Sequence, residues 1–279
     1  MTAKIYDSKP LVGRMIEQLR SEAAQFYKQH QRSARLAQII VGHDAAAELY
    51  SRQLVHACQT IGLACTTLAY PFEMQEEELR AQVTRLSDDT TIDGVVLLLP
   101  LPEHIRQRIV TEALPSQKDV DGLGPSNAGN LLLGFPNFVP STADVVLTVL
   151  RDADIPIAGR YAVIVGRSNV GGKPTALLLM SHDATVTICH SYTQDLASIT
   201  SSADILVVSV GRPGLITADM VKTGAIVLDA GINTVNGRVV GDVDFATVKE
   251  KAAFLTPVPG GLGPLTHLTL IRHTLLGPH

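Results

Sequence analysis

A glycine-rich turn between two apolar segments carries the clearest chemical signal in this chain. Residues 162–165 are all apolar and mostly β-branched, which predicts a strand buried on both faces of a parallel sheet. The turn that follows holds Gly166, Gly171 and Gly172, and a helical pattern opens at Pro174. Such a strand–turn–helix would hold the pyrophosphate of a dinucleotide at the helix N-terminus. The second glycine of the strict fingerprint is missing, so the pattern alone also fits a turn without a ligand.

The end of the next predicted strand, over 184–189, indicates which dinucleotide binds. NAD sites place an Asp or Glu there, about 20 residues after the glycines, to bond the ribose 2′-hydroxyl. Here the predicted strand is followed by His190, Ser191, Tyr192 and Thr193, none of which carries a carboxylate. Ser191 can donate to a 2′-phosphate, and Arg167 adds a fixed positive charge. We therefore expect NADP rather than NAD, with an ordinary solvated loop as the alternative at His190 and Ser191.

The elements that must position these residues alternate along the whole chain. Between 114 and 140 regular patterning fails, so we expect a binding loop that is also a domain boundary. The alternation predicts an α/β protein with a three-layer N-terminal domain over 1–139, to which 266–279 return, a Rossmann-type domain over 140–265, and a cleft between them. The expected strands cover 36–41, 63–70, 94–99, 184–189, 205–210 and 225–228, and the expected helices cover 11–29, 44–61, 76–87, 142–151 and 265–275, with another from about 103.

Composition narrows the class of protein. The chain is 46% hydrophobic but only 4% aromatic, so its core must rest on aliphatic side chains, as in parallel-sheet proteins. A net charge of −4 gives no reason to expect a nucleic-acid or membrane partner. The three cysteines have no metal-ligand spacing, and the first residues lack an apolar signal core. We expect a cytoplasmic protein with buried, reduced thiols and no metal site.

Several separated motifs then stand in one order along the chain. Together they resemble the methylenetetrahydrofolate dehydrogenase/cyclohydrolase family, whose members act in one-carbon metabolism and supply purine biosynthesis. The resemblance covers nearly the whole chain, and so many ordered motifs make a chance match very improbable. The motifs are PLP at 100–102, KDVDG at 118–122, VGRSN with GKP at 165–174, CHS ending at 191, DAGIN at 229–233, GDVDF at 241–245 and TPVPGGLGPLT at 256–266.

The resemblance implies a folate-site domain, an NADP domain, a tetrahydrofolate-type substrate and a homodimer. It implies catalytic roles for Tyr50 and Asp121, where Asp121 would hold the pterin through a bidentate carboxylate contact. The implied cofactor-binding residues are Gly166, Arg167, Ser168, Ser191 and Ile232. The implied substrate-binding residues are Tyr50, Asp121, Pro259, Gly260 and Gly263.

Departures from the family pattern fall mostly on the folate side. The family helix carries Tyr-x-x-x-Lys, whereas here Tyr50 is followed by Leu54. The family strand before PLP ends in Gln-Leu-Pro, whereas here Leu98 replaces the Gln. A lysine and a glutamine suit each other as partners, so replacing both by leucine is a consistent conversion to a dry apolar wall. Nearby, Arg52 and His56 are expected to face away from Tyr50.

These departures affect the two family reactions differently. Hydride transfer needs only that two carbons be held close, whereas hydrolysis needs a base or polarising amine, which typically contributes about 10²–10⁴-fold. We therefore expect an NADP-dependent oxidation of 5,10-methylenetetrahydrofolate to the methenyl form, with cyclohydrolase activity weak or lost. Two alternatives remain: a paralogue that keeps the NADP domain and takes another substrate, and a catalytically silent ligand-binding subunit.

Overall fold

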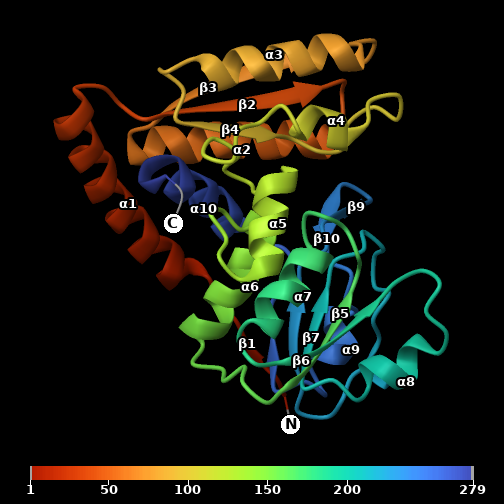
Figure 1. The fold of residues 1–279 in the computed structure, drawn as a ribbon. Helices are drawn as coiled ribbons and strands as arrows, with labels where there is room; N and C mark the ends of the chain where they lie inside the picture. Colours follow the sequence, from red (N-terminus) through yellow and green to blue (C-terminus); the bar gives the residue numbers. More distant parts are fainter. Residues whose placement is uncertain (1, 278–279) are drawn as a thin grey trace. The chain divides into compact units, whose positions relative to one another are not determined.

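The computed structural model describes residues 2–277, which form two compact α/β units (Figure 1). The six-stranded unit contains residues 2–12 and 142–266, and the three-stranded unit contains 13–141 and 267–277. The C-terminal residues 267–277 thus group with the three-stranded unit. Residues 2–12 differ from expectation, because strand β1 (Lys4–Ile5) pairs with β11 (Phe254–Leu255) of the six-stranded unit.

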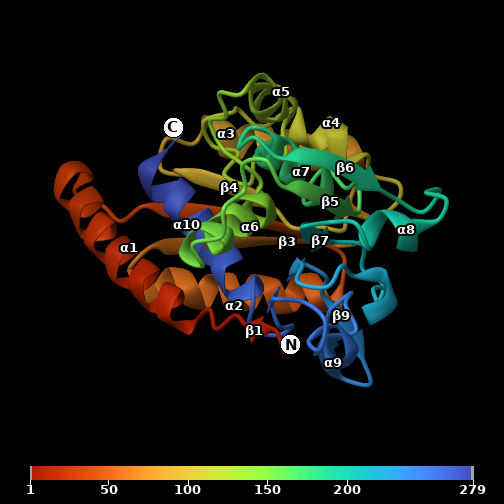
Figure 2. The same cartoon turned by 90° about the horizontal axis from the view of Figure 1, so that it is seen from below.

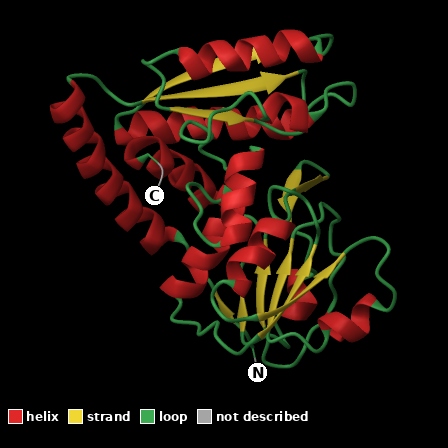
Figure 3. Ribbon diagram, in the orientation of Figure 1, coloured by secondary structure: helices red, strands yellow, loops and turns green. Residues whose placement is uncertain are grey.

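The three-stranded unit is built on a parallel sheet with the order β3-β2-β4. Its strands β2 (Arg35–Val41) and β4 (Gly94–Leu97) are almost wholly buried, as their largely apolar sequences predict. Figure 3 shows helices on both faces of this sheet, with α2 on one side and α3 on the other. The other elements of this unit are α1 (Lys9–His30), α2 (Ala45–Ile61), β3 (Ala64–Tyr70), α3 (Glu76–Asp88), α4 (Gln107–Thr111) and α5 (Pro125–Leu133).

Helix α2 ends where its sequence signals predict. The Asp44 carboxylate accepts a hydrogen bond from the Ala47 amide at 2.8 Å, and Gly62 closes the helix with a φ of +102°. Helix α5 lies inside the segment 114–140, for which we expected no regular structure, so that prediction is wrong. Pro125 opens this helix and Gly134 ends it at a φ of +86°, so its boundaries use ordinary signals that the loop-like composition obscured.

The six-stranded unit carries an all-parallel sheet with the order β1-β11-β8-β7-β5-β6. One face packs on a cluster that includes Leu206, Val227 and Val248, all fully buried. A separate two-stranded hairpin, β9 (Asn233–Val235) and β10 (Arg238–Val240), is antiparallel. The remaining elements are α6 (Ser141–Asp152), β5 (Tyr161–Val165), α7 (Gly172–Met180), β6 (Thr185–Cys189), α8 (Leu196–Thr200), β7 (Ile205–Val208), η1 (Ala218–Met220), β8 (Ile226–Asp229), α9 (Phe245–Val248) and α10 (Gly263–Leu276), which runs on into the three-stranded unit.

The path of the chain through this sheet creates a switch point. Strand β5 pairs with β6 on one side and β7 on the other, so the chain leaves β5 in one direction and returns to its opposite edge. Ligands of doubly wound sheets bind where the carboxyl ends of such strands diverge. Helix α7 follows β5 and packs against β5 and β6. The glycine-rich turn therefore lies at the switch point, where ligands bind in doubly wound sheets.

The three cysteines are free, and Cys65 is only partly buried whereas Cys58 and Cys189 are fully enclosed. The expectation of three buried thiols therefore holds for two of them. Across residues 2–277, no helix combines the length and the apolar character needed to cross a bilayer.

Candidate active site

A cavity of about 380 Å³ lies at the carboxyl ends of β5, β6 and β7. Three loops build it, one after each strand, so residues far apart in sequence meet at one sheet edge. Its polar lining includes both a cationic and a hydroxyl-rich part, which suits a phosphate-bearing ligand. The lining residues are Val165, Gly166, Arg167, Ser168, His190, Ser191, Thr193, Leu196, Ser209, Val210, Arg212 and Leu215.

The glycines of the first loop are required by close backbone packing. Gly166 has a φ of +128°, and a Cβ there would collide with the carbonyl oxygen of Ser209. A Cβ on Gly172 would collide with the carbonyl oxygen of Gly166. The Ser168 hydroxyl accepts hydrogen bonds from the amides of Gly171, at 3.1 Å, and Gly172, at 3.4 Å. Ser168 therefore shapes the turn into α7, and the bare backbone leaves room for a ligand to approach.

The second loop presents Ser191 to the same cavity, beside Arg167 of the first loop, and neither loop adds a carboxylate. The Arg167 guanidinium lies 5.7 Å from the centre of the Tyr192 ring, an exposed cation–π contact that keeps the charge beside the strand end. The turn itself is held by the Thr193 hydroxyl, which accepts from the His190 amide at 2.8 Å. Arg167 and Ser191 thus offer a positive charge and a hydroxyl group at this strand end, and their contact with a 2′-phosphate stays a prediction.

The third loop was missed by sequence reasoning. It brings Arg212 into the cavity, and the carboxylate of the fully buried Asp242 holds it there. Asp242 Oδ2 accepts from the backbone amides of Val210 at 2.7 Å and Gly211 at 3.0 Å, and Oδ1 accepts from the backbone amide of Arg212 at 2.8 Å. The available signal was a Gly-Arg-Pro run directly after a buried strand, at the same sheet edge as the glycine turn.

The remaining cofactor residue expected from the resemblance lies apart from this cavity. Ile232 is 59% exposed and is not among the residues that line the cavity. It follows Gly231, whose absent side chain makes room for Asp242. A direct cofactor contact by Ile232 therefore stays a prediction.

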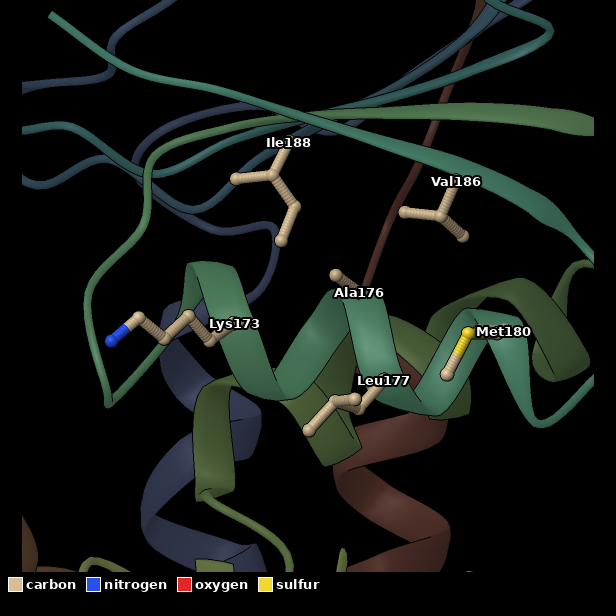
Figure 4. Close-up of a pocket in the computed structure, with 6 residues that line it drawn as sticks. All are labelled: Lys173, Ala176, Leu177, Met180, Val186 and Ile188. Atoms are coloured by element: carbon tan, nitrogen blue, oxygen red, sulfur yellow. The ribbon is translucent and has the colours of Figure 1, made fainter. Parts of the chain in front are cut away.

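A second hollow of about 290 Å³ lies between α7 and the edge strand β6. Figure 4 shows Val186 and Ile188 pointing from β6 toward Ala176 of the helix. Lys173 supplies the only charged side chain among the six lining residues, and its ammonium donates to Asn169 at 2.9 Å. The other five lining residues are apolar and the Lys173 ammonium is paired with Asn169, so we do not take this hollow as a candidate for chemistry.

In the three-stranded unit, Tyr50 is half-buried on α2, and the two departures from the family pattern are hydrocarbons inside the fold. Leu54, one turn further along α2, is 0% exposed, and Leu98, just past β4, is 5% exposed. On strand β2, the buried Gln38 side chain donates to Thr67 at 2.7 Å and to the Ser51 carbonyl at 3.3 Å. The expected apolar character at Leu54 and Leu98 is thus present.

Asp121 is buried and accepts a hydrogen bond from the Ser141 amide at 2.9 Å, where helix α6 begins. Burial raises the pKa of Asp121 to about 6, against the opposing hydrogen bonds from Ser141. Its neighbour Asp119 accepts from Gly124 at 2.7 Å and from Asn127 at 2.9 Å. The Asp121 carboxylate thus accepts a hydrogen bond at the N-terminus of α6 rather than capping the turn at Gly122.

The third set of expected substrate residues lies in the six-stranded unit. The peptide bond before Pro259 is cis, and the Gly260 carbonyl accepts from the Ser8 hydroxyl at 2.6 Å. Gly263 opens α10. Within the described part of the chain, no three His, Cys, Asp or Glu side chains gather in a way that would hold a metal ion.

One residue near Tyr50 was not anticipated. The ring of His267, on α10, lies 4.2 Å from the Tyr50 ring, centre to centre, with 31° between the planes. Figure 1 and Figure 2 both show α10 running beside α2. Sequence reasoning considered only α2 itself for a replacement polar group. The available signal was a histidine in an otherwise apolar stretch of the C-terminal helix.

A parallel sheet with a glycine turn and a cationic cavity at its switch point defines a dinucleotide-binding protein of the doubly wound class. The family model described as "Tetrahydrofolate dehydrogenase/cyclohydrolase, NAD(P)-binding domain" matches residues 140–277, and the "catalytic domain" model of the same family matches 6–121. The chain belongs to the tetrahydrofolate dehydrogenase/cyclohydrolase family. The expectation of an NADP cofactor is confirmed by the NAD(P)-binding domain together with a related structure that holds NADP.

Individual relatives span nearly the whole chain. "Bifunctional protein FolD" of Halalkalibacterium halodurans is 44% identical over 275 residues, covering 99% of this chain and 98% of the relative. The FolD crystal structure from Campylobacter jejuni is 38% identical with a TM-score of 0.93, covering 98% of this chain and 97% of that one. The Trypanosoma brucei FolD structure, complexed with NADP and an inhibitor, is 34% identical with a TM-score of 0.93, covering 99% and 97%.

Proposed function

We propose that this chain oxidises 5,10-methylenetetrahydrofolate to the methenyl form with NADP, and that its hydrolysis of the methenyl product is weak. The observation that carries this proposal is the combination of a cationic, carboxylate-free cofactor cavity with two buried leucines at the family's Lys and Gln positions. Arg167 and Arg212 line the cofactor cavity, and Leu54 and Leu98 are the two buried leucines.

The cofactor side contributes binding and orientation. NADP, when bound, supplies the acceptor for the hydride. Gly166 and Gly172 leave the backbone open to its phosphates, Ser191 and Arg167 meet a 2′-phosphate, and Arg212 adds a second positive charge. None of these groups must give or take a proton for hydride transfer, so this half of the chemistry needs nothing that the chain lacks.

Hydrolysis makes a different demand. Water must lose a proton as it attacks the methenyl carbon, and a positioned base typically contributes about 10²–10⁴-fold. Leu54 and Leu98 can neither take a proton nor polarise the substrate. The proposal therefore separates the two activities that the names of the relatives join, and keeps Tyr50 and Asp121 as substrate-binding residues.

The test is a pair of assays on one preparation of the purified chain. Methylenetetrahydrofolate is mixed with NADP or NAD while the absorbance of the methenyl product is followed, and methenyl hydrolysis is measured separately against the rate in buffer. We expect methenyl formation with NADP, slower formation with NAD, and hydrolysis well below the dehydrogenase rate. Hydrolysis as fast as oxidation would contradict the second half of the proposal.

The apolar lining also supports a second candidate, in which the NADP domain is kept and the substrate differs. In that case NADP binds with its usual signal, but no methenyl absorbance develops. A silent subunit would bind a ligand without turnover of any folate. The homodimer also remains a proposal, and sedimentation of the purified chain at several concentrations tests it.

A further inference from the structure

A polar side chain from α10, His267, lies beside Tyr50. His267 is 7% exposed, and its ring packs on the ring of Tyr50 at 4.2 Å. Leu54, the residue one turn along α2 from Tyr50, is hydrocarbon and fully buried. The imidazole therefore stands beside an implied substrate-binding tyrosine, in a wall that is otherwise stripped of the family's amine and amide.

One nitrogen of this imidazole has no partner. Nε2 of His267 is buried and makes no hydrogen bond to any described residue. A buried polar atom left unpaired typically costs about 1–3 kcal/mol, so it calls for a partner such as a bound ligand, a reacting group or an ordered water. Ring packing against Tyr50 alone would be served as well by a phenylalanine, which carries no such cost.

The protonation state suits a proton acceptor. Burial lowers the pKa of His267 to about 4, and a hydrogen bond to the Tyr50 backbone opposes this shift. The ring is therefore neutral at pH 7. Because Nε2 has no partner, we assign the backbone contact to Nδ1, which then carries the ring proton and leaves the Nε2 lone pair without a donor.

We propose that His267 is the base for the weak methenyl hydrolysis of this chain, a role that rests on the function proposed above. Water adds to the methenyl carbon, its oxygen–carbon bond forms as the π pair of the C=N⁺ bond moves to nitrogen, and the water proton passes to Nε2. The imidazolium then returns that proton to the departing ring nitrogen as the carbon–nitrogen bond breaks. The remaining hydroxyl proton leaves to solvent, so the products are a formyl group and one proton.

The basicity of the group explains why the reaction is slow as well as why it occurs. A base is most effective when its pKa lies near the working pH, and burial has moved His267 well below that point. An amine on α2 is thus replaced by a weaker base on α10.

The test compares His267→Phe, His267→Gln and the wild-type chain by the ratio of methenyl hydrolysis to dehydrogenase rate in the same preparation. Phe keeps an aromatic ring against Tyr50 but has no nitrogen, and Gln keeps hydrogen bonding but cannot take a proton. We expect the ratio to fall about 10²-fold in both variants, at the low end of the usual effect of a base. His30→Phe is the matched control, since His30 is exposed and stacks on Phe26 at 4.2 Å on α1. Its ratio should equal that of the wild type.

Three outcomes overturn the role of His267. A wild-type ratio in His267→Phe shows that only ring packing matters. Wild-type hydrolysis no faster than buffer shows that there is no catalysed reaction to explain. Should His267→Phe fold poorly, an unchanged ratio in His267→Gln overturns the role as well. By contrast, a wild-type chain that forms no methenyl product from methylenetetrahydrofolate and NADP refutes the proposed function itself.

Discussion

Asp242 offers the sharpest test of how this fold builds its cofactor cavity. Oδ2 of its carboxylate accepts hydrogen bonds from the backbone amides of Val210 and Gly211. Oδ1 accepts from the backbone amide of Arg212 and from the Asn233 side-chain amide, the latter at 2.9 Å. In Asp242→Asn, one oxygen becomes an NH₂ group that faces donors. If the NH₂ faces Oδ2's partners, two backbone amides lose their acceptor. If it faces Oδ1's partners, the Arg212 amide loses its acceptor. Asn233 can then turn its own amide to accept, which gives up its 3.4 Å hydrogen bond to the Val240 carbonyl.

The magnitude follows from this lower-cost arrangement. One part-buried amide without an acceptor costs about 1–3 kcal/mol, so we expect the free energy of unfolding to fall by at least about 1 kcal/mol. The same three amides hold the loop that carries Arg212 into the cavity. If NADP binds only the ordered loop, the same free energy raises the Kd for NADP by about 5- to 150-fold. Both quantities come from one preparation, by urea unfolding and by titration with NADP.

Asp219→Asn is the matched control for this change. Asp219 is exposed and its carboxylate accepts from the Thr217 hydroxyl, outside the residues that line the cavity. We expect a change in unfolding free energy within about 0.5 kcal/mol and an unchanged Kd for NADP. If Asp242→Asn behaves like this control in both measurements, the carboxylate does not organise the loop and the reasoning is refuted.

Three further predictions follow from other residues. Arg167→Gln should raise the KM for NADP about 10- to 100-fold, the loss of one charge-assisted hydrogen bond, and leave the KM for NAD unchanged, with the exposed Arg238→Gln as control; equal effects on both cofactors would contradict this. Leu54→Lys alone should lower stability in urea unfolding by about 3–5 kcal/mol because it buries an unpaired charge, whereas adding Leu98→Gln should recover part of this and raise hydrolysis relative to oxidation. Burial raises the pKa of Asp229 from 3.8 to about 6, so its contribution to stability is present below pH 4 and is lost as the pH rises through 6; carboxyl ¹³C NMR should show this midpoint, and one near 4 would contradict it.

Regular patterning predicted most of this fold because its strands are buried on both faces. The run 162–165 became part of β5, and residues 94–97 became β4, since an all-aliphatic stretch of that length bounded by Gly or Pro has few other solutions. Helix α5 was missed for the opposite reason. Its Gly, Pro and Asn content is that of a loop, and its buried Asn127 is held by a side-chain contact outside the helix, to the Asp119 carboxylate at 2.9 Å.

In the candidate site, too, some residues could be predicted from local sequence patterns and others could not. Gly166, Arg167, Ser168 and Ser191 line one cavity, as predicted, because they follow two adjacent parallel strands. Arg212 could be anticipated only by knowing that β7 returns to the other edge of β5. That return is a property of the sheet order, which local sequence does not carry.

The sequence by itself determined the chemistry that this protein keeps on its cofactor side and the hydrocarbon that replaces an amine and an amide on α2. Both are matters of residue type at short spacing, where one strand end or one helical turn brings the groups together. Only the tertiary structure decided that His267, 217 positions after Tyr50, packs on that tyrosine. Contacts of such separation depend on how a C-terminal helix docks beside α2, and packing of whole elements, not local preference, sets that arrangement.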